Sequence, residues 1–182
     1  LSIFYYAEDF NAWAKLNNNQ KESRIIIPLI SQDGKVFGYQ GRSLDKNTKL
    51  RYITTILDKD YPKLFGLDRV NNTQRVYVTE GPFDSLFLSN AIAMCGSDVT
   101  LDDAQFTNLV YVLDNEPRNY EIVKKYEKLI QSGKQIVIWP NTIKEKDLND
   151  MIMSGHNVQR VVDSNIYSGL EATIKLNAWK KV

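Results

Sequence analysis

The sequence feature that most constrains the fold is the stretch Val-Tyr-Val-Thr-Glu-Gly-Pro-Phe-Asp at residues 76–84. Its β-branched and aromatic residues predict a strand that ends near Gly81, and Pro82 is tolerated in the first turn of a following helix. Glu80 then lies at the carboxyl end of the strand, and Asp84 lies in the first helical turn, where the helix dipole favours an anion. We therefore expect two carboxylates to face one small volume, as in a site for Mg²⁺ or Mn²⁺.

The composition excludes several classes of protein. Of the 182 residues, 43% are hydrophobic, which is enough for a substantial core, and 23 Lys and Arg balance 22 Asp and Glu. One cysteine, Cys95, and one histidine exclude an internal disulfide framework and a Cys/His zinc site. No apolar run approaches the roughly 18 residues of a membrane span and no signal pattern is present, so we expect a cytoplasmic protein with no membrane partner.

The residue pattern predicts four segments. Residues 1–22 read as an N-terminal tether, and residues 23–72 as a basic, β-rich subdomain, because an Asp-Gly pair within it is a strong hairpin signal. Over residues 73–155, short apolar strands alternate with helical patterns, which is typical of a mainly parallel sheet flanked by helices. Residues 156–182 read as a C-terminal helical segment. The predicted fold class is α/β, and the start of the chain reads as mid-chain sequence, so we expect a fragment of a longer protein.

Three groups of acidic residues follow predicted strands of the parallel half. They are Glu80 with Asp84, Asp114 with Glu116, and Asp147 with Asp150. In an open α/β sheet, ligands bind beyond the carboxyl ends of the strands, so we expect these groups to converge although they are far apart in sequence. Carboxylates that share a pocket repel one another, and bound divalent cations would offset that repulsion.

Most of these acids also have a purely structural explanation. Asp84 and Asp150 stand where acids stabilise the start of a helix, and Asp147 has the position of an N-cap. The turn that begins at Asp114 has ordinary turn residues. Glu80 has no such explanation, because Glu is depleted in strands and is not a favoured capping residue. The joint pattern of three acidic groups after three strands of one sheet favours a metal site.

The acidic segments resemble the ordered motifs of the Toprim domain, which bacterial-type primases, topoisomerases and some nucleases share. The matching segments are Glu-Gly-Pro-Phe-Asp at 80–84, Asp-Asn-Glu at 114–116 and Lys-Asp-Leu-Asn-Asp at 146–150. Within that group, the chain resembles the RNA polymerase domain of T-even-type bacteriophage DNA primases. This closer resemblance is carried by Gly-Tyr-Gln-Gly-Arg-Ser-Leu at 38–44, Leu-Arg-Tyr-Ile-Thr at 50–54, Leu-Phe-Gly at 64–66 and Val-Leu-Asp-Asn-Glu-Pro-Arg at 112–118.

The resemblance implies a Toprim-like fold and a nucleotidyltransferase that makes short RNA primers on single-stranded DNA from ribonucleoside triphosphates. It implies that Glu80, Asp114, Glu116 and Asp147 bind Mg²⁺ or Mn²⁺, that Glu80 either ligates metal or takes the proton, and that Asp84 supports catalysis. The second motif reads Asp-Asn-Glu where many Toprim domains have Asp-x-Asp, which alters the geometry of metal binding more than its chemistry. If a phage encodes the chain, its location is the host cytoplasm.

Basic residues carry the other half of the resemblance. Arg42 and Arg51 match basic positions of the family's nucleotide and template groove, and Lys63 is a further candidate; the rigid fork of arginine suits phosphate oxygens. The alternative is a solvated arginine on an edge strand. The family also has an N-terminal zinc-binding module, which is missing from this chain, and acts with a replicative helicase. No Gly-rich Walker sequence is present here, so the helicase belongs to another chain or region.

Three other functions use the same features. A Toprim-type nuclease would use the same acids, and the segments around Arg42 and Arg51 oppose it because they resemble the primase half. A topoisomerase is opposed by the length of the chain, which is short for a strand-passage gate. A non-catalytic module that binds DNA or helicase in a primosome is opposed by the presence of all the acidic positions.

Overall fold

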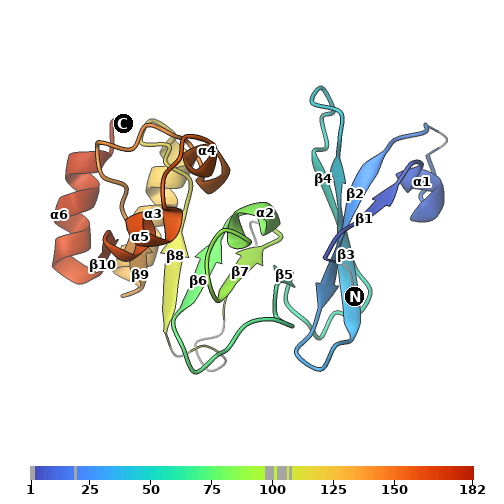
Figure 1. The fold of residues 1–182 in the computed structure, drawn as a ribbon, viewed down its shortest axis with the longest axis horizontal. Helices are drawn as coiled ribbons and strands as arrows, with labels where there is room; N and C mark the ends of the chain where they lie inside the picture. Colours follow the sequence, from blue (N-terminus) through green and yellow to red (C-terminus); the bar gives the residue numbers. More distant parts are fainter. Residues whose placement is uncertain (1–2, 19, 97–100, 102–105, 107) are drawn as a thin grey trace. The chain divides into compact units, whose positions relative to one another are not determined.

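The computed structural model describes residues 3–18, 20–96, 101, 106 and 108–182. The chain divides into two units, and Figure 1 shows the elements of each. The first unit consists of Leu1–Asp68 and Cys95–Leu101, and the second consists of Arg69–Met94 and Asp102–Val182. The four-stranded antiparallel sheet is in the first unit and the mainly parallel strands are in the second, so the β-rich N-terminal part predicted from the sequence is confirmed.

An antiparallel sheet forms the first unit. Its strands, in spatial as well as sequence order, are β1 (Tyr5–Ala7), β2 (Arg24–Ile30), β3 (Val36–Ser43) and β4 (Tyr52–Ile56). The hairpin between β2 and β3 turns at Gly34, whose φ of +83° is a conformation that glycine adopts without strain. The unit also contains the short helix α1 (Phe10–Trp13) and the two-residue strand β5 (Leu64–Phe65).

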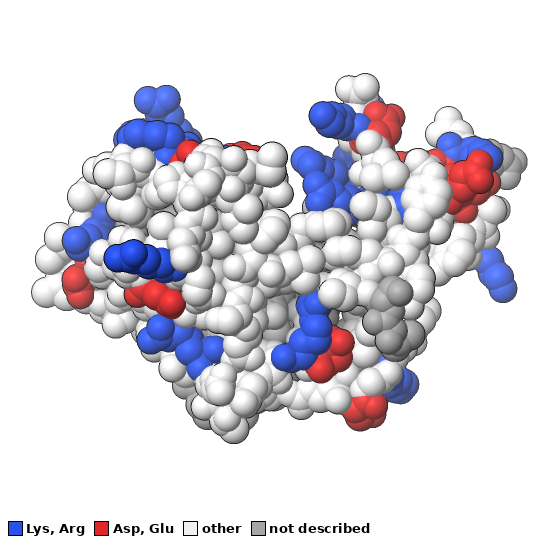
Figure 2. All heavy atoms as spheres, in the orientation of Figure 1, with Lys and Arg blue, Asp and Glu red and all other residues white. Residues whose placement is uncertain are grey.

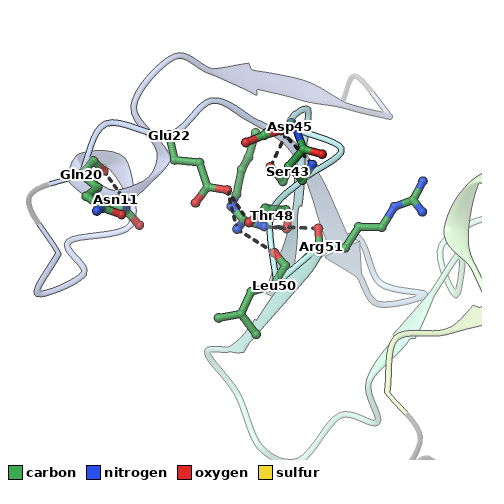
Figure 3. Close-up of polar contacts among 11 residues, drawn as sticks. Asn11, Gln20, Glu22, Ser43, Asp45, Thr48, Leu50 and Arg51 are labelled. Carbon is green, nitrogen blue, oxygen red and sulfur yellow. Dashed lines mark hydrogen bonds and ion pairs between the residues drawn. The ribbon is translucent and has the colours of Figure 1, made fainter.

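A buried arginine connects the strands of this sheet. Arg24, at the start of β2, has 1% of its surface exposed. Its guanidinium group forms an ion pair with Glu22 at 2.8 Å and donates to the backbone oxygens of Gly41 (2.9 Å), Leu50 (2.8 Å) and Arg51 (3.3 Å). Figure 3 shows Glu22, Leu50 and Arg51 around this network. A buried charge is tolerated only with such partners, so Arg24 fixes the backbone that leads into β4.

Helix α1 covers the same part of the sheet. The ring of Phe10 is fully buried, and the Cζ atom of Arg24 lies 5.3 Å from its centroid. A Cβ atom at Gly41 would lie 2.4 Å from this ring, so only glycine fits at that position of β3. Residues 5–13, which fall in the segment expected to be a tether, therefore form β1 and α1 and pack on the sheet.

A mainly parallel sheet forms the second unit. Its strands are, in spatial order, β10 (Ile166–Tyr167), β9 (Gln135–Val137), β8 (Leu109–Val112), β6 (Val76–Thr79) and β7 (Ala91–Met94). Among these five strands, β10 pairs antiparallel with β9, and the other pairs are parallel. The strands between β10 and β7 consist largely of buried residues, as expected for strands covered on both faces.

Helices follow these strands. They are α2 (Pro82–Ser85), α3 (Tyr120–Gln131), α4 (Leu148–Met153), α5 (Val158–Asp163) and α6 (Gly169–Trp179). Helix α3 starts at the N-cap Asn119, and one stripe of it is buried, including Tyr126, whose ring centroid lies 5.0 Å from that of Trp179 in α6. Among the described helices, none is both long and apolar enough to span a membrane.

We predict that Arg24→Ala destabilises the protein by about 3–5 kcal/mol, because it removes a buried cation and leaves Glu22 and three backbone oxygens, of which that of Gly41 is buried, without their donor. Urea unfolding followed by circular dichroism measures this change. The control is Lys21→Ala, which removes an ion pair to Glu8 whose two side chains are 62% and 73% exposed; we expect no measurable change there. Equal stabilities of the two variants would contradict the role of Arg24.

Candidate active site

Two acids meet where neighbouring parallel strands end. Thr79, the last residue of β6, is in register with Val112, the last residue of β8. Glu80 follows β6 directly and Asp114 follows β8 by two residues, and the backbone N–H of Asp114 donates to Oε2 of Glu80 at 3.3 Å. Sheet register therefore brings together two residues that are 34 positions apart in sequence.

Asp84 faces the end of the same strand. It lies in the first turn of α2, which begins after Gly81 with Pro82 at its N-terminal end. A Cβ atom at Gly81 would lie 3.0 Å from Oδ2 of Asp84, so the carboxylate folds back over the residue that ends the strand region. The absence of a side chain at Gly81 leaves the space for this approach.

Asp114 is the acid whose proton affinity the fold changes most clearly. Burial raises the pKa of Asp114 to about 7, with further contributions from the negative charges of Glu80, Asp84 and Asp147, while Lys146 acts in the opposite direction. Glu80, Asp84 and Asp147, which belong to the other two acidic groups, therefore act on the charge of Asp114. Excess negative charge in a partly buried place favours binding of a cation or a proton.

Lysine side chains already compensate two of the acids. Lys125 of α3 forms an ion pair with Glu80, and Lys146 forms one with Glu116 at 3.2 Å. Asp147 accepts a hydrogen bond from the backbone N–H of residue 150 at 2.8 Å and so caps α4, as the structural explanation of its position predicted. In the described residues, no three Asp, Glu, His or Cys side chains are grouped as ligands of one ion.

Asn115, between Asp114 and Glu116, joins two loops of the site. Its amide nitrogen donates to the carbonyl oxygens of Glu145 (2.9 Å) and Ile143 (3.3 Å), and its backbone N–H donates to that of Lys146 at 2.6 Å. Its own amide oxygen accepts from the indole N–H of Trp179 at 3.0 Å. The side chain of Asn115 therefore holds the loop after β8 against the loop that leads to Asp147.

The basic candidates lie in the first unit. Arg42 is on β3 opposite Tyr52 of β4, and its Cζ atom lies 5.6 Å from the centroid of that ring. The carbonyl oxygen of Arg51 accepts a hydrogen bond from Arg24, while the exposed side chain of Arg51 points away from that network (Figure 3). Lys63 is half-buried, and its carbonyl oxygen accepts from the backbone N–H of Cys95 at 2.8 Å.

The structure thus relates the acidic candidates Glu80, Asp84, Asp114 and Asp147 through hydrogen bonding, close approach or charge. Glu116 is tied to the same region through Lys146, which acts on Asp114 as well. Sequence reasoning did not identify Lys125, Lys146, Asn115 or Trp179. The position of Asn115 inside the Asp-Asn-Glu motif was a usable signal, whereas Lys125 looks like any polar residue on the exposed side of a helix.

Comparison with known proteins identifies relatives of one kind. The chain is 36% identical over 167 residues to the DNA primase of Enterobacteria phage T4, an alignment that covers 88% of this chain and 48% of the phage protein. It is 28% identical over 178 residues to the DNA primase of Mycoplasma genitalium, which covers 86% of this chain and 28% of that protein. The chain therefore spans less than half the length of either relative. No protein-family model matches it.

Solved structures identify the fold. The Aquifex aeolicus primase, with its zinc-binding and RNA polymerase domains, matches with a TM-score of 0.63 at 19% identity over 89% of this chain and 51% of that one. The RNA polymerase domain of Mycobacterium tuberculosis primase, in complex with a double-stranded DNA oligomer that has a 6-nucleotide overhang, matches with a TM-score of 0.64 at 18% identity over 83% of this chain and 56% of that one. The resemblance and the Toprim-like fold predicted from the sequence are confirmed.

We predict that Asp114→Asn becomes more stable relative to the unchanged protein as the pH rises. The folded state holds the Asp114 proton up to a pH of about 7, whereas the unfolded chain releases it near a pH of about 4. The unchanged protein therefore loses stability across that interval, and the Asn variant lacks this loss. Urea unfolding at pH 5 and pH 8 with EDTA measures the difference, and an identical difference at both pH values would refute the assignment.

We also predict that Trp179→Phe, which keeps a ring but removes the donor to Asn115, destabilises the protein by about 1–2 kcal/mol. It should also weaken Mn²⁺ binding measured by calorimetry, because the loops that carry Asp114 and Asp147 lose a connection. Trp13→Phe is the matched control, since Trp13 is 51% exposed on α1. If Trp179→Phe changes stability but leaves Mn²⁺ affinity unaltered, the indole only supports the fold.

Proposed function

We propose that this chain is the catalytic domain of a DNA primase, which joins ribonucleotides into short primers on a single-stranded DNA template. The observation that carries the proposal is the meeting of Glu80 and Asp114 at the ends of adjacent parallel strands, with Asp84 and Asp147 acting on the same carboxyl group. Similarity to the phage T4 primase over 88% of the chain supports the choice of reaction.

The acidic residues fit a divalent cation by their chemistry. Their donors are carboxylate oxygens, which Mg²⁺ and Mn²⁺ prefer, and burial together with the neighbouring carboxylates Glu80 and Asp84 raises the pKa of Asp114 to about 7. Asp114, Glu116, Glu80 and Asp147 would hold the metal, and Lys125 and Lys146 would release their carboxylates when it binds. When bound, the metal supplies charge that polarises the attacking hydroxyl and offsets charge on the phosphates.

In the proposed reaction, the 3′-hydroxyl oxygen of one nucleotide forms a bond to the α-phosphorus of a ribonucleoside triphosphate. The bond from that phosphorus to the oxygen of the β-phosphate breaks, and pyrophosphate leaves with the electron pair. Glu80 can accept the hydroxyl proton where it is not a metal ligand, since it lies at the strand end beside Asp114. Asp84 supports the site by adding negative charge beside Asp114.

The basic residues of the first unit supply the contacts to nucleic acid and nucleotide in this proposal. Arg42 and Arg51 would bind phosphate or template, and Lys63 would add a further positive charge. The backbone around Arg51 is fixed by Arg24, so its side chain is presented from a rigid base. A replicative helicase and a zinc-binding module outside this chain complete the proposed partners, and the proposed location is the host cytoplasm.

We predict that Glu80→Gln lowers ribonucleotide incorporation by about 100-fold or more, because an amide neither binds metal as a carboxylate does nor accepts the proton. The assay uses the protein that contains this chain, with its helicase, single-stranded DNA and labelled ribonucleotides. Glu121→Gln is the control, since Glu121 is exposed in the first turn of α3. Normal primer yield from Glu80→Gln would remove the assignment, and cleavage of the labelled DNA instead would indicate a nuclease.

For the basic residues, we predict that Arg42→Ala weakens binding of single-stranded DNA and makes it less dependent on salt. Loss of one phosphate contact lowers the slope of log affinity against log salt by about 0.7. Fluorescence anisotropy at several salt concentrations measures both quantities. Lys21→Ala removes an exposed charge from the same unit and should leave the slope unchanged; the same result for Arg42→Ala would show a solvated surface arginine.

A further inference from the structure

A cavity of about 480 Å³ lies beside the acidic residues in the second unit. It is lined by residues 115–119 after β8, by residues of the 140–144 segment after β9, and by Trp179 and Lys181 at the end of the chain. Its volume is in the range of pockets that bind small molecules. Asn115 and Glu116 belong both to this cavity and to the loop of the candidate active site, so the two share this loop.

The charges of the residues that line the cavity favour an anionic ligand. Arg118, Lys144 and Lys181 are cationic. Glu116 is the one carboxylate among the residues that line the cavity, and Lys146 already compensates it at 3.2 Å. Figure 2 shows Lys and Arg side chains gathered at the edge of the second unit where the chain ends in Figure 1. The cavity therefore has an excess of positive charge that its own lining does not neutralise.

These cations are available to a ligand. Within the described part of the chain, the side chains of Arg118 and Lys181 form neither a hydrogen bond nor an ion pair with another residue. Lys144 donates to the backbone oxygen of Asn141, which carries no full charge. The backbone N–H of Lys181 donates to the carbonyl oxygen of Pro117 at 2.8 Å, which holds the end of the chain at the wall of the cavity.

We propose that this cavity binds the polyphosphate of a nucleotide. On the basis of the proposed function, the cavity is assigned to the triphosphate of the nucleotide that starts the primer. In the first bond-forming step, the nucleotide whose 3′-hydroxyl attacks keeps its own triphosphate, whereas the other loses pyrophosphate. The retained triphosphate needs cationic side chains of its own, and Arg118 with Lys144 and Lys181 supplies them.

The binding test uses inorganic triphosphate as the probe and the protein that contains this chain, with EDTA to remove metal. Calorimetry should show binding that weakens at least fivefold in Arg118→Ala, a substitution that removes no hydrogen bond or ion pair within the described residues and so should not unfold the protein. Arg160→Ala, which removes an exposed arginine from α5, should bind as the unchanged protein does. No binding, or equal binding by Arg118→Ala, would overturn the proposal.

A kinetic test separates this site from the catalytic one. Primer synthesis is started either from a nucleoside triphosphate or from a 5′-hydroxyl dinucleotide, which has no polyphosphate to bind. Arg118→Ala should raise KM for the starting triphosphate at least fivefold and leave synthesis from the 5′-hydroxyl dinucleotide unchanged. Equal effects on both starters would overturn the assignment to the starting nucleotide. Triphosphate binding without any primer synthesis would refute the proposed function alone and leave the polyphosphate site standing.

Discussion

Mutual repulsion of carboxylates at one edge of a parallel sheet is the constraint on which the second unit depends. The register of β6 and β8 places Glu80 beside the backbone of Asp114, and no rearrangement of side chains alone can separate the two chain segments. Lys125 and Lys146 offset part of this negative charge through ion pairs, and Asp147 accepts a capping hydrogen bond. Asp114 responds with a raised pKa. A structure that only needed stability would more simply carry apolar residues there, so the acids are best explained by a cationic partner.

The parts of this arrangement that the sequence predicted are those with local causes. The strand, Gly-Pro turn and helix start at residues 76–84 follow from β-propensity and from the tolerance of proline in a first helical turn. The positions of Glu80 and Asp114 follow in turn, because each comes within two residues of a strand end. The hairpin at Gly34 is equally local, since its turn requires a positive φ.

Contacts that depend on how elements pack could not be predicted in this way. The ion pair between Lys125 and Glu80 depends on the rotation of α3 about its axis. The spacing of apolar residues in the sequence indicates that rotation only approximately. Strand β10 has two residues and pairs antiparallel at the edge, so it shows no usable periodicity. The burial of Arg24 runs against the general behaviour of arginine and becomes intelligible only when its backbone acceptors are known.

The hydrogen bond from Trp179 to Asn115 joins residues that are 64 positions apart. It connects α6 to the loop that carries Asp114 and Glu116. A fusion tag or a truncation placed a few residues before the end of α6 would thus act on the loop between β8 and α3 as a mutation there does. Hydrogen exchange of the amides at residues 115 and 181 should then respond together, since one donates to Lys146 and the other to Pro117. Inactivity of a protein shortened at this end would reflect an altered loop as much as a missing segment.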